Sequence, residues 1–147
     1  MAIDCADPAR LARFWADVLG YQPQDPPLEY SSWSEFSAAV GAPGEEWNAV
    51  VDPDGVGPRV LFHRVPEPKL VKNRVHLDVR VSGVGTTSGH SRRHLVDAEV
   101  SRLLAAGATH LRTVEDEIDY FAVMQDPEAN DPERPSTRSI TSLVNAA

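Results

Sequence analysis

The two halves of the sequence follow the same order of structural elements, and this repeat constrains the fold more than any other feature. Each half reads as a strand, an amphipathic helix, a glycine that ends the helix, and strands that close on an Asp-Pro turn. The segment 49–54 (AVVDPD) even resembles 122–128 (AVMQDPE), which indicates an internal duplication. Amphipathic helices beside β-strands predict an α+β domain. Because each half is too small to bury both faces of its sheet, we expect its open face to curve towards the other half.

A helix is predicted directly after a short first strand, residues 2–6. The Asp7 carboxylate can accept from the free N–H groups of the first turn, and Pro8 stands where a missing N–H costs nothing. Alternation in the strand places Cys5 on the helix side and Asp4 on the other side. Gly20 follows as the end of the helix. The apolar stripe at helical spacing consists of Leu11, Phe14, Trp15, Val18 and Leu19.

A second, shorter helix is predicted after a proline-rich loop. Ser32 and Glu35 have capping-box spacing, and Trp33, Phe36 and Val40 would share the buried face of this helix, which Gly41 would end. The remaining elements of the first half are strands at 48–51 and 59–65 and the turn 52–55 (DPDG) between them.

The second half opens on the most regular strand of the chain, residues 74–81. Its apolar residues are Val75, Leu77, Val79 and Val81, and its polar residues are His76, Asp78 and Arg80. Since the apolar face should pack on a helix, we expect the polar face to look into a cleft. The other predicted elements are a loop at 82–91, strands at 109–113 and 120–125, and a helix at 95–106 with the stripe Val96, Val100, Leu103 and Leu104.

Composition excludes several classes of protein. The length of 147 residues fits one domain, and the formal net charge of −8 without a basic stripe argues against nucleic acid as a partner. No apolar run approaches the roughly 20 residues that cross a membrane, and the first residues lack the features of a secretory signal. A single cysteine, Cys5, cannot form an internal disulfide. We therefore expect a cytoplasmic protein with no membrane partner.

Several ordered motifs carry a family resemblance: the opening 3–21, the segment 52–62 (DPDGVGPRVLF), the segment 65–79 (VPEPKLVKNRVHLDV) and the helix end 105–108 (AAGA). They resemble glyoxalase-like domains of the vicinal oxygen chelate superfamily, which includes glyoxalase I, extradiol dioxygenases and bleomycin-resistance proteins. The resemblance covers about residues 2–130. It implies a single domain, 1–147, made of module one (1–70) and module two (71–147). Two β-α-β-β-β modules would form a curved mixed sheet around a cleft, with the helices outside.

In metal-using relatives the ligands come from the first and last strand of each module. By this resemblance His76 matches the first-strand position of module two, whereas its counterpart in module one would fall before Met1. His63 lies near the last-strand position of module one, and Glu133 lies where relatives place a carboxylate. The metal implied is a divalent ion, Zn, Ni, Fe or Mn. Such a site normally needs three or more protein ligands, and only His76 matches firmly.

Without a metal, the same polar face would bind an organic ligand directly. The candidate ligand-binding residues are His63, His76, Asp78, Arg80, Asp4, Trp33, Trp47 and Tyr120. Each has an ordinary structural alternative: a salt bridge for Asp78 and Arg80, a strand position for His63, and the core for the aromatic residues. A further basic group, His90, Arg92, Arg93 and His94, is expected in a loop, either solvated or as a lid over an anionic ligand.

Two classes of function remain. The first is a small-molecule pocket protein that binds or sequesters a small organic ligand. The second is a divalent-metal-dependent lyase, isomerase or dioxygenase of glyoxalase type, in which a metal polarises vicinal oxygens and a carboxylate or histidine moves a proton. The incomplete set of ligands favours the first class.

Assembly and the tail give the last expectations. We expect strands 2–6 and 74–81 to lie side by side at the centre, and the resemblance implies a homodimer. Pro132 and Pro135 predict a loop at 131–137 where relatives have an apolar closing strand. Residues 138–144 have the β-branched and apolar character to supply a substitute strand, on this chain's own sheet or on a partner chain.

Overall fold

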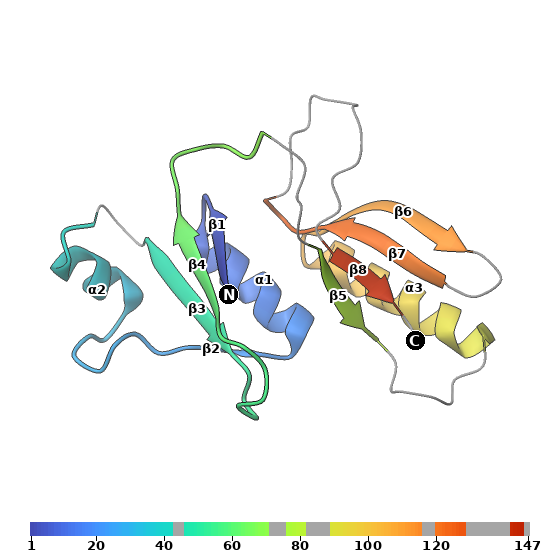
Figure 1. Ribbon diagram of the computed structural model, residues 1–147, viewed down its shortest axis with the longest axis horizontal. Coiled ribbons are helices and arrows are strands. Elements are labelled where there is room, and N and C mark those ends of the chain that lie inside the picture. Colours follow the sequence, from blue (N-terminus) through green and yellow to red (C-terminus); the bar gives the residue numbers. More distant parts are fainter. Residues whose placement is uncertain (43–45, 71–75, 82–88, 116–119, 129–141, 146–147) are drawn as a thin grey trace. The chain divides into compact units, whose positions relative to one another are not determined.

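The computed structural model describes residues 1–42, 46–70, 76–81, 89–115, 120–128 and 142–145, which form two compact units (Figure 1). Unit 1 is Met1–Pro68 and unit 2 is Lys69–Ala147. The assignment of both units to a single domain stays a prediction. Within the described residues, no helix is long and apolar enough to cross a membrane.

Unit 1 contains a four-stranded mixed sheet in the order β1-β4-β3-β2. β1 runs parallel to β4, and β3 is antiparallel to both β4 and β2. The strands are β1 (Ala2–Cys5), β2 (Gln22–Pro23), β3 (Trp47–Val51) and β4 (Val60–Arg64).

Helix α1 (Pro8–Leu19) packs along one face of this sheet and supplies much of the core of unit 1 (Figure 1). The predicted caps are confirmed: the Asp7 carboxylate accepts from the backbone N–H of Arg10, and Gly20 has φ 68°. Burying each large side chain contributes about 1.5–3 kcal/mol. The buried members of the stripe are Leu11, Phe14, Trp15 and Val18, and the sheet adds Cys5, Val50, Val60 and Phe62.

Helix α2 (Trp33–Ala39) begins as the capping-box spacing predicts. The Ser32 hydroxyl accepts from the backbone N–H of Glu35, and the Glu35 carboxylate accepts from both the N–H and the hydroxyl of Ser31. The prediction that Val40 lies on the buried face is wrong, because the helix ends at Ala39 and Val40 is 52% exposed.

The turn after β3 is held by one carboxylate. Asp52 accepts backbone N–H bonds from Gly57 at 2.6 Å, Asp54 at 3.0 Å and Val56 at 3.1 Å. These bonds, that of Gly57 most of all, hold the pKa of Asp52 below its usual value. The charged side chain therefore fixes the path of the chain from β3 into β4.

Unit 2 contains a second four-stranded mixed sheet, in the order β5-β8-β7-β6. β5 runs parallel to β8, which is antiparallel to β7. The strands are β5 (Leu77–Arg80), β6 (Thr109–Glu115), β7 (Tyr120–Gln125) and β8 (Ser142–Asn145). The N-terminal part of the predicted strand 74–81 lies partly outside the described residues.

Helix α3 (Gly89–Ala105) starts earlier than its sequence predicts, so placing His90 to His94 in a loop is wrong. A glycine costs little in a first turn, whose N–H groups have no partner within the helix. Contacts with the sheet also stabilise the first turns of α3, since Arg93 forms an ion pair with Glu115 of β6 and Val96 is fully buried. At the other end Leu103 is buried as predicted, whereas Leu104 is 46% exposed.

The two units are built alike, which confirms the α+β class and the two β-α-β-β-β modules. In each sheet the first strand of the module pairs in parallel with the last, and the third strand pairs antiparallel with the last. β8 completes unit 2 from the tail, so the predicted substitute strand is confirmed at 142–144, while 131–141 and Glu133 lie outside the described residues. β1 and β5 are each an edge of their own sheet, and their predicted pairing with each other stays a prediction.

Removing β8 should destabilise the protein strongly. A chain that ends at residue 141 lacks the strand between β5 and β7 and so loses two ladders of hydrogen bonds, each bond contributing about 0.5–1.5 kcal/mol. We expect the melting temperature to fall by about 10 °C or more by circular dichroism. A chain that lacks only residues 146–147 is the control. An unchanged melting temperature in the shorter chain would show that the tail strand does not hold unit 2 together.

Candidate functional site

The open face of the unit 1 sheet carries a row of three side chains from three strands. In the strand register His63 of β4 lies opposite Asp4 of β1 on one side and Trp47 of β3 on the other. Directly opposed residues project from the same face of a sheet, so the three side chains stand side by side. Cys5, the neighbour of Asp4, is buried on the helix side, which confirms the predicted alternation.

The three side chains contact one another and remain accessible to solvent. Nδ1 of His63 lies 3.8 Å from Oδ1 of Asp4, with the two side chains 40% and 70% exposed. The His63 and Trp47 rings are stacked, with an interplanar angle of 5° and a centroid distance of 5.8 Å. Because parallel rings in contact are separated by about 3.5–4 Å, this centroid distance means that the rings are offset and overlap only in part.

Three more aromatic rings extend this row towards α2. Phe36 is the link: its ring centroid lies 5.7 Å from Trp47, 5.9 Å from Trp33 and 5.3 Å from Tyr30. All four rings are half-buried. Trp33 is fixed further, because its indole Nε1–H donates to the carbonyl oxygen of Gln24 at 2.9 Å. We call Asp4, His63, Trp47, Phe36, Trp33 and Tyr30 the aromatic row.

Glu35 holds α2 in place at the end of this row. Its carboxylate accepts from the hydroxyl and backbone N–H of Ser31, and these two bonds lower the pKa of Glu35. The charged form therefore keeps the start of α2 fixed and, with it, the position of Phe36 one residue later.

Sequence reasoning found most of the aromatic row but missed Tyr30. A signal for Tyr30 is present near the cap of α2: Tyr30 lies two residues before the N-cap Ser32, one residue earlier than the first position of a hydrophobic staple, and packs on Phe36 at the second position.

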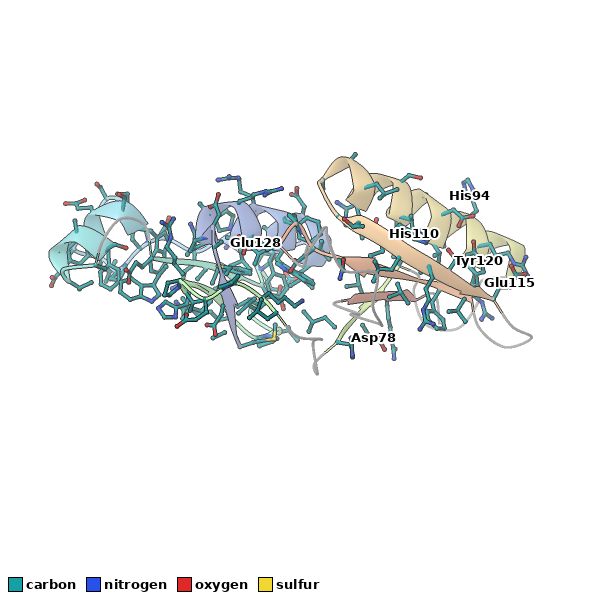
Figure 2. All side chains as sticks on the ribbon, turned by 90° about the horizontal axis from the view of Figure 1, so that it is seen from above. Asp78, His94, His110, Glu115, Tyr120 and Glu128 are labelled. Atoms are coloured by element: carbon teal, nitrogen blue, oxygen red, sulfur yellow. The ribbon has the colours of Figure 1, made fainter. Side chains whose placement is uncertain are left out.

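The predicted site residues of unit 2 lie around β5. Asp78 and Arg80 are both exposed and project from the same face of their strand, and Figure 2 shows Asp78 on the side of the sheet away from α3. Among the described residues no ion pair joins Asp78 to Arg80. His76 precedes the strand, and its Nδ1 is buried without a hydrogen-bond partner in the described part of the chain.

Tyr120 faces the helix instead. Its phenol O–H donates to the Asp97 carboxylate on α3 at 2.6 Å, and this bond raises the pKa of Tyr120. The Arg93 guanidinium lies 5.4 Å from the ring centroid of Tyr120. The α3 side of the sheet, where Figure 2 shows Tyr120 and Glu115, is opposite to the side of Asp78. Within unit 2 the structure therefore places Tyr120 on the face opposite to Asp78 and Arg80.

The repeat allows a direct comparison of the two open faces. Because the counterpart of His76 falls before Met1, Arg80 stands at the position of Asp4, and both residues project from the face opposite the helix. Arg80 lies opposite Asn145 of β8, which lies opposite Phe121 of β7. Where unit 1 has aspartate, histidine and tryptophan side by side, unit 2 thus has arginine, asparagine and phenylalanine at the corresponding register positions.

The donor set does not make a metal site among the described residues. No group of three or more His, Cys, Asp or Glu side chains lies close enough together there to hold a metal ion. Asp4 and His63 are one pair in unit 1, and His76 belongs to unit 2. The strand that closes unit 2, Ser142–Asn145, contains neither a carboxylate nor an imidazole in its sequence.

A family model matches most of the chain, and several solved structures share its fold. The sequence model of the glyoxalase-like domain matches residues 1–132. A glyoxalase/bleomycin resistance protein/dioxygenase family enzyme from Burkholderia phytofirmans PsJN has a similar structure, with a TM-score of 0.57 and 18% identity over 99% of this chain and 94% of that one. A glyoxalase/dioxygenase from Nostoc punctiforme has a TM-score of 0.57 and 13% identity over 99% and 87% of the two chains.

A third similar structure is a mutant of the fosfomycin resistance protein FosX from Listeria monocytogenes, in complex with Mn(II) and 1S,2S-dihydroxypropylphosphonic acid. Its TM-score is 0.58, with 7% identity over 100% of this chain and 89% of that one. At these identities the structures show a shared fold. No curated protein matches the sequence.

The comparison of the two units predicts that His63 is not needed for folding. Replacing it with asparagine, the residue at the corresponding register position of unit 2, should change the free energy of unfolding by no more than about 1 kcal/mol. Urea denaturation measures this. The matched control is Phe62→Ala at the neighbouring, fully buried position, which should cost about 3–5 kcal/mol. A loss above about 2 kcal/mol in His63→Asn would assign His63 a role in the fold instead.

Proposed function

The chain belongs to the glyoxalase-like domain family, and we propose that it is a small-molecule-binding protein whose ligand lies on the open face of unit 1. The aromatic row is the proposed binding surface, with Asp4, His63 and Trp47 as its polar end. Binding, rather than metal-assisted catalysis, is the function that these residues support best.

The observation that carries this proposal is the exposure of the stacked His63–Trp47 pair. Aromatic side chains usually bury their area in a core, where each contributes substantially to stability. Here the rings of His63 and Trp47 on the sheet and those of Phe36, Trp33 and Tyr30 at α2 are left partly accessible, beside a carboxylate that is 70% exposed. Such a combination of flat apolar surface with a few polar groups is typical of sites for small organic ligands.

The second candidate is a divalent-metal-dependent lyase, isomerase or dioxygenase, and one observation favours it. Nδ1 of His76 is buried without a hydrogen-bond partner among the described residues, and an imidazole nitrogen of this kind is a suitable metal ligand. The FosX structure with Mn(II) shows that the fold accommodates a metal in another protein. A single imidazole does not hold a metal, and the described part of the chain brings no further ligands to it.

Ligand screening by NMR tests the proposal. We expect planar organic compounds to shift the indole N–H resonance of Trp47 and the amide resonances of Asp4 and His63. Trp47→Ala should weaken binding of such a compound about tenfold, because the lost stacking surface contributes about 0.5–1.5 kcal/mol beyond its area. Val40→Ala, at an exposed apolar residue outside the aromatic row, is the control and should leave the affinity unchanged.

Metal analysis of the same preparation separates the two candidates. The proposal fails if the ligand shifts only resonances of residues 77–80 and 120–125. It also fails if Mn(II) or Zn(II) shifts the His76 resonances stoichiometrically and every ligand needs that metal in order to bind. Metal-independent shifts at Trp47 support it.

We also propose that the protein is a cytoplasmic homodimer. Each sheet has edge strands, β1 and β2 in unit 1 and β5 and β6 in unit 2, and an edge strand presents unpaired backbone groups that a second chain can cover. The single cysteine, Cys5, is buried, with Sγ 3.5 Å from the carbonyl oxygen of His63, which suits a reducing compartment. Light scattering should give about twice the chain mass of 16.1 kDa, and a monomer at micromolar concentration would contradict the dimer.

A further inference from the structure

The polar end of the aromatic row carries a negative charge with no cation close to it in the sheet. Asp4 is 70% exposed, and among the described residues its carboxylate contacts Nδ1 of His63, at 3.8 Å. At that distance, and at this exposure, the contact with the imidazole does not neutralise the carboxylate. Asp4 is therefore available to a positively charged group from solution.

The elements around the row carry no basic side chain that would compete for Asp4. β1, α2 and β3, which are fully described, contain no lysine or arginine, and they contribute Asp4 and Glu35. On β4, Arg64 lies opposite Cys5 and so projects from the face opposite to His63. Arg59 projects from the same face as His63, but it is four residues away, about 13 Å along the strand direction. Its guanidinium donates to the Gln24 side chain.

The neighbouring rings add a second attraction for the same kind of ligand. The face of an aromatic ring carries partial negative charge, so it attracts cations as well as planar apolar groups. The His63 and Trp47 rings are offset, with centroids 5.8 Å apart, and each leaves part of its face uncovered. A flat ligand that lies over this pair would also be within reach of the Asp4 carboxylate, because Asp4 and His63 are direct neighbours in register.

The repeat shows that this combination is not a requirement of the fold. Unit 2 builds the same sheet with Arg80 at the position of Asp4, and the register neighbours of Arg80 are Asn145 and Phe121. The first strand of unit 2 therefore carries a cation at the position where β1 carries a carboxylate. The pairing of a carboxylate with imidazole and indole is thus particular to unit 1.

We infer that the open face of unit 1 selects a planar organic cation, whose ring stacks on His63 and Trp47 and whose positive charge pairs with Asp4. This inference rests on the proposed function and specifies the chemical class of its ligand. A quaternised or protonated heteroaromatic compound has this chemistry, whereas an anion such as a phosphonate or carboxylate would be repelled by Asp4.

A matched series of compounds tests the inference by changing one property at a time. N-methylquinolinium is planar and cationic, quinoline is planar and neutral at pH 7.5, naphthoate is planar and anionic, and tetramethylammonium is cationic without a ring. Their affinities are measured by titration of the Trp47 indole N–H resonance at low salt. We expect N-methylquinolinium to bind about tenfold more tightly than quinoline, and naphthoate and tetramethylammonium to bind more weakly than quinoline.

Two variants assign the selectivity to Asp4. Asp4→Asn keeps the shape of the side chain and should reduce the preference for N-methylquinolinium over quinoline about threefold to fivefold, with little change for quinoline itself. Asp54→Asn, an equally conservative change at an exposed turn residue of the same unit, is the matched control and should preserve the preference. Added salt should weaken the binding of N-methylquinolinium but not that of quinoline, and this measurement needs no variant.

The outcomes separate this inference from the proposed function. If quinoline or naphthoate binds at Trp47 as tightly as N-methylquinolinium, the selectivity for cations is wrong and the binding function stands. If tetramethylammonium binds as tightly, the stacking part is wrong. If none of the compounds shifts Trp47, Asp4 or His63, the proposed binding surface itself is wrong.

Discussion

In each unit the first strand lies parallel to the last, and the other elements are arranged around that pair. Two parallel neighbours cannot be joined by a hairpin, so the chain must leave the first strand, cross over and return. In unit 1 the crossover contains α1, which buries Trp15, Phe14 and Leu11 against one face of the sheet. The opposite face is left without a helix of its own. The parallel register of β1 and β4 also places Asp4 beside His63. The same strand pair therefore positions the polar end of the aromatic row.

The sheet of unit 2 has the same kind of residues on the helix face but different residues on the open face. The fold therefore constrains the helix face more than the open face. Both units need apolar residues on the helix face, and both have them: Phe62 and Val60 in β4, and Ala122 and Met124 in β7 are almost fully buried. On the other face the units have diverged. Unit 2 has Asn145 where unit 1 has His63, so the fold itself does not require an imidazole stacked on an indole at this position.

The chemistry of the donors favours the proposed binding function over metal catalysis in this glyoxalase-like chain. A metal site gathers three or more ligands around one point, because each ligand offsets part of the cost of removing water from the ion. The described residues instead spread their polar groups along a strand pair, with one carboxylate and one imidazole 3.8 Å apart beside a line of rings. A flat aromatic surface beside one carboxylate suits a ligand that stacks and forms an ion pair. Such binding depends on contact area and alignment, whereas metal binding depends on the number of ligands around one point.

Local chemistry made the helices and strands of this protein predictable. The caps at Asp7, Gly20 and Ser32, and the apolar stripe of α1, act over a few residues and can be read directly. Alternation in β1 placed Asp4 opposite to Cys5, and the β-branched residues of the tail indicated the strand that became β8. The errors lie where packing overrides local signals, as at Val40, which leaves α2, and at the start of α3, where contacts with Glu115 extend the helix through a glycine.

For the candidate site, too, some features could be predicted from the sequence and others depend on the tertiary structure. The sequence determined that Asp4, His63, Trp47 and Trp33 are polar or aromatic residues near strands, and that too few metal ligands match the family pattern. It did not determine that they form one row, nor that Tyr30 belongs to it while Tyr120 turns to α3. Only the tertiary structure decided this, because strand register joins residues such as Asp4 and His63 that are 59 positions apart in the sequence, and no local preference encodes that pairing.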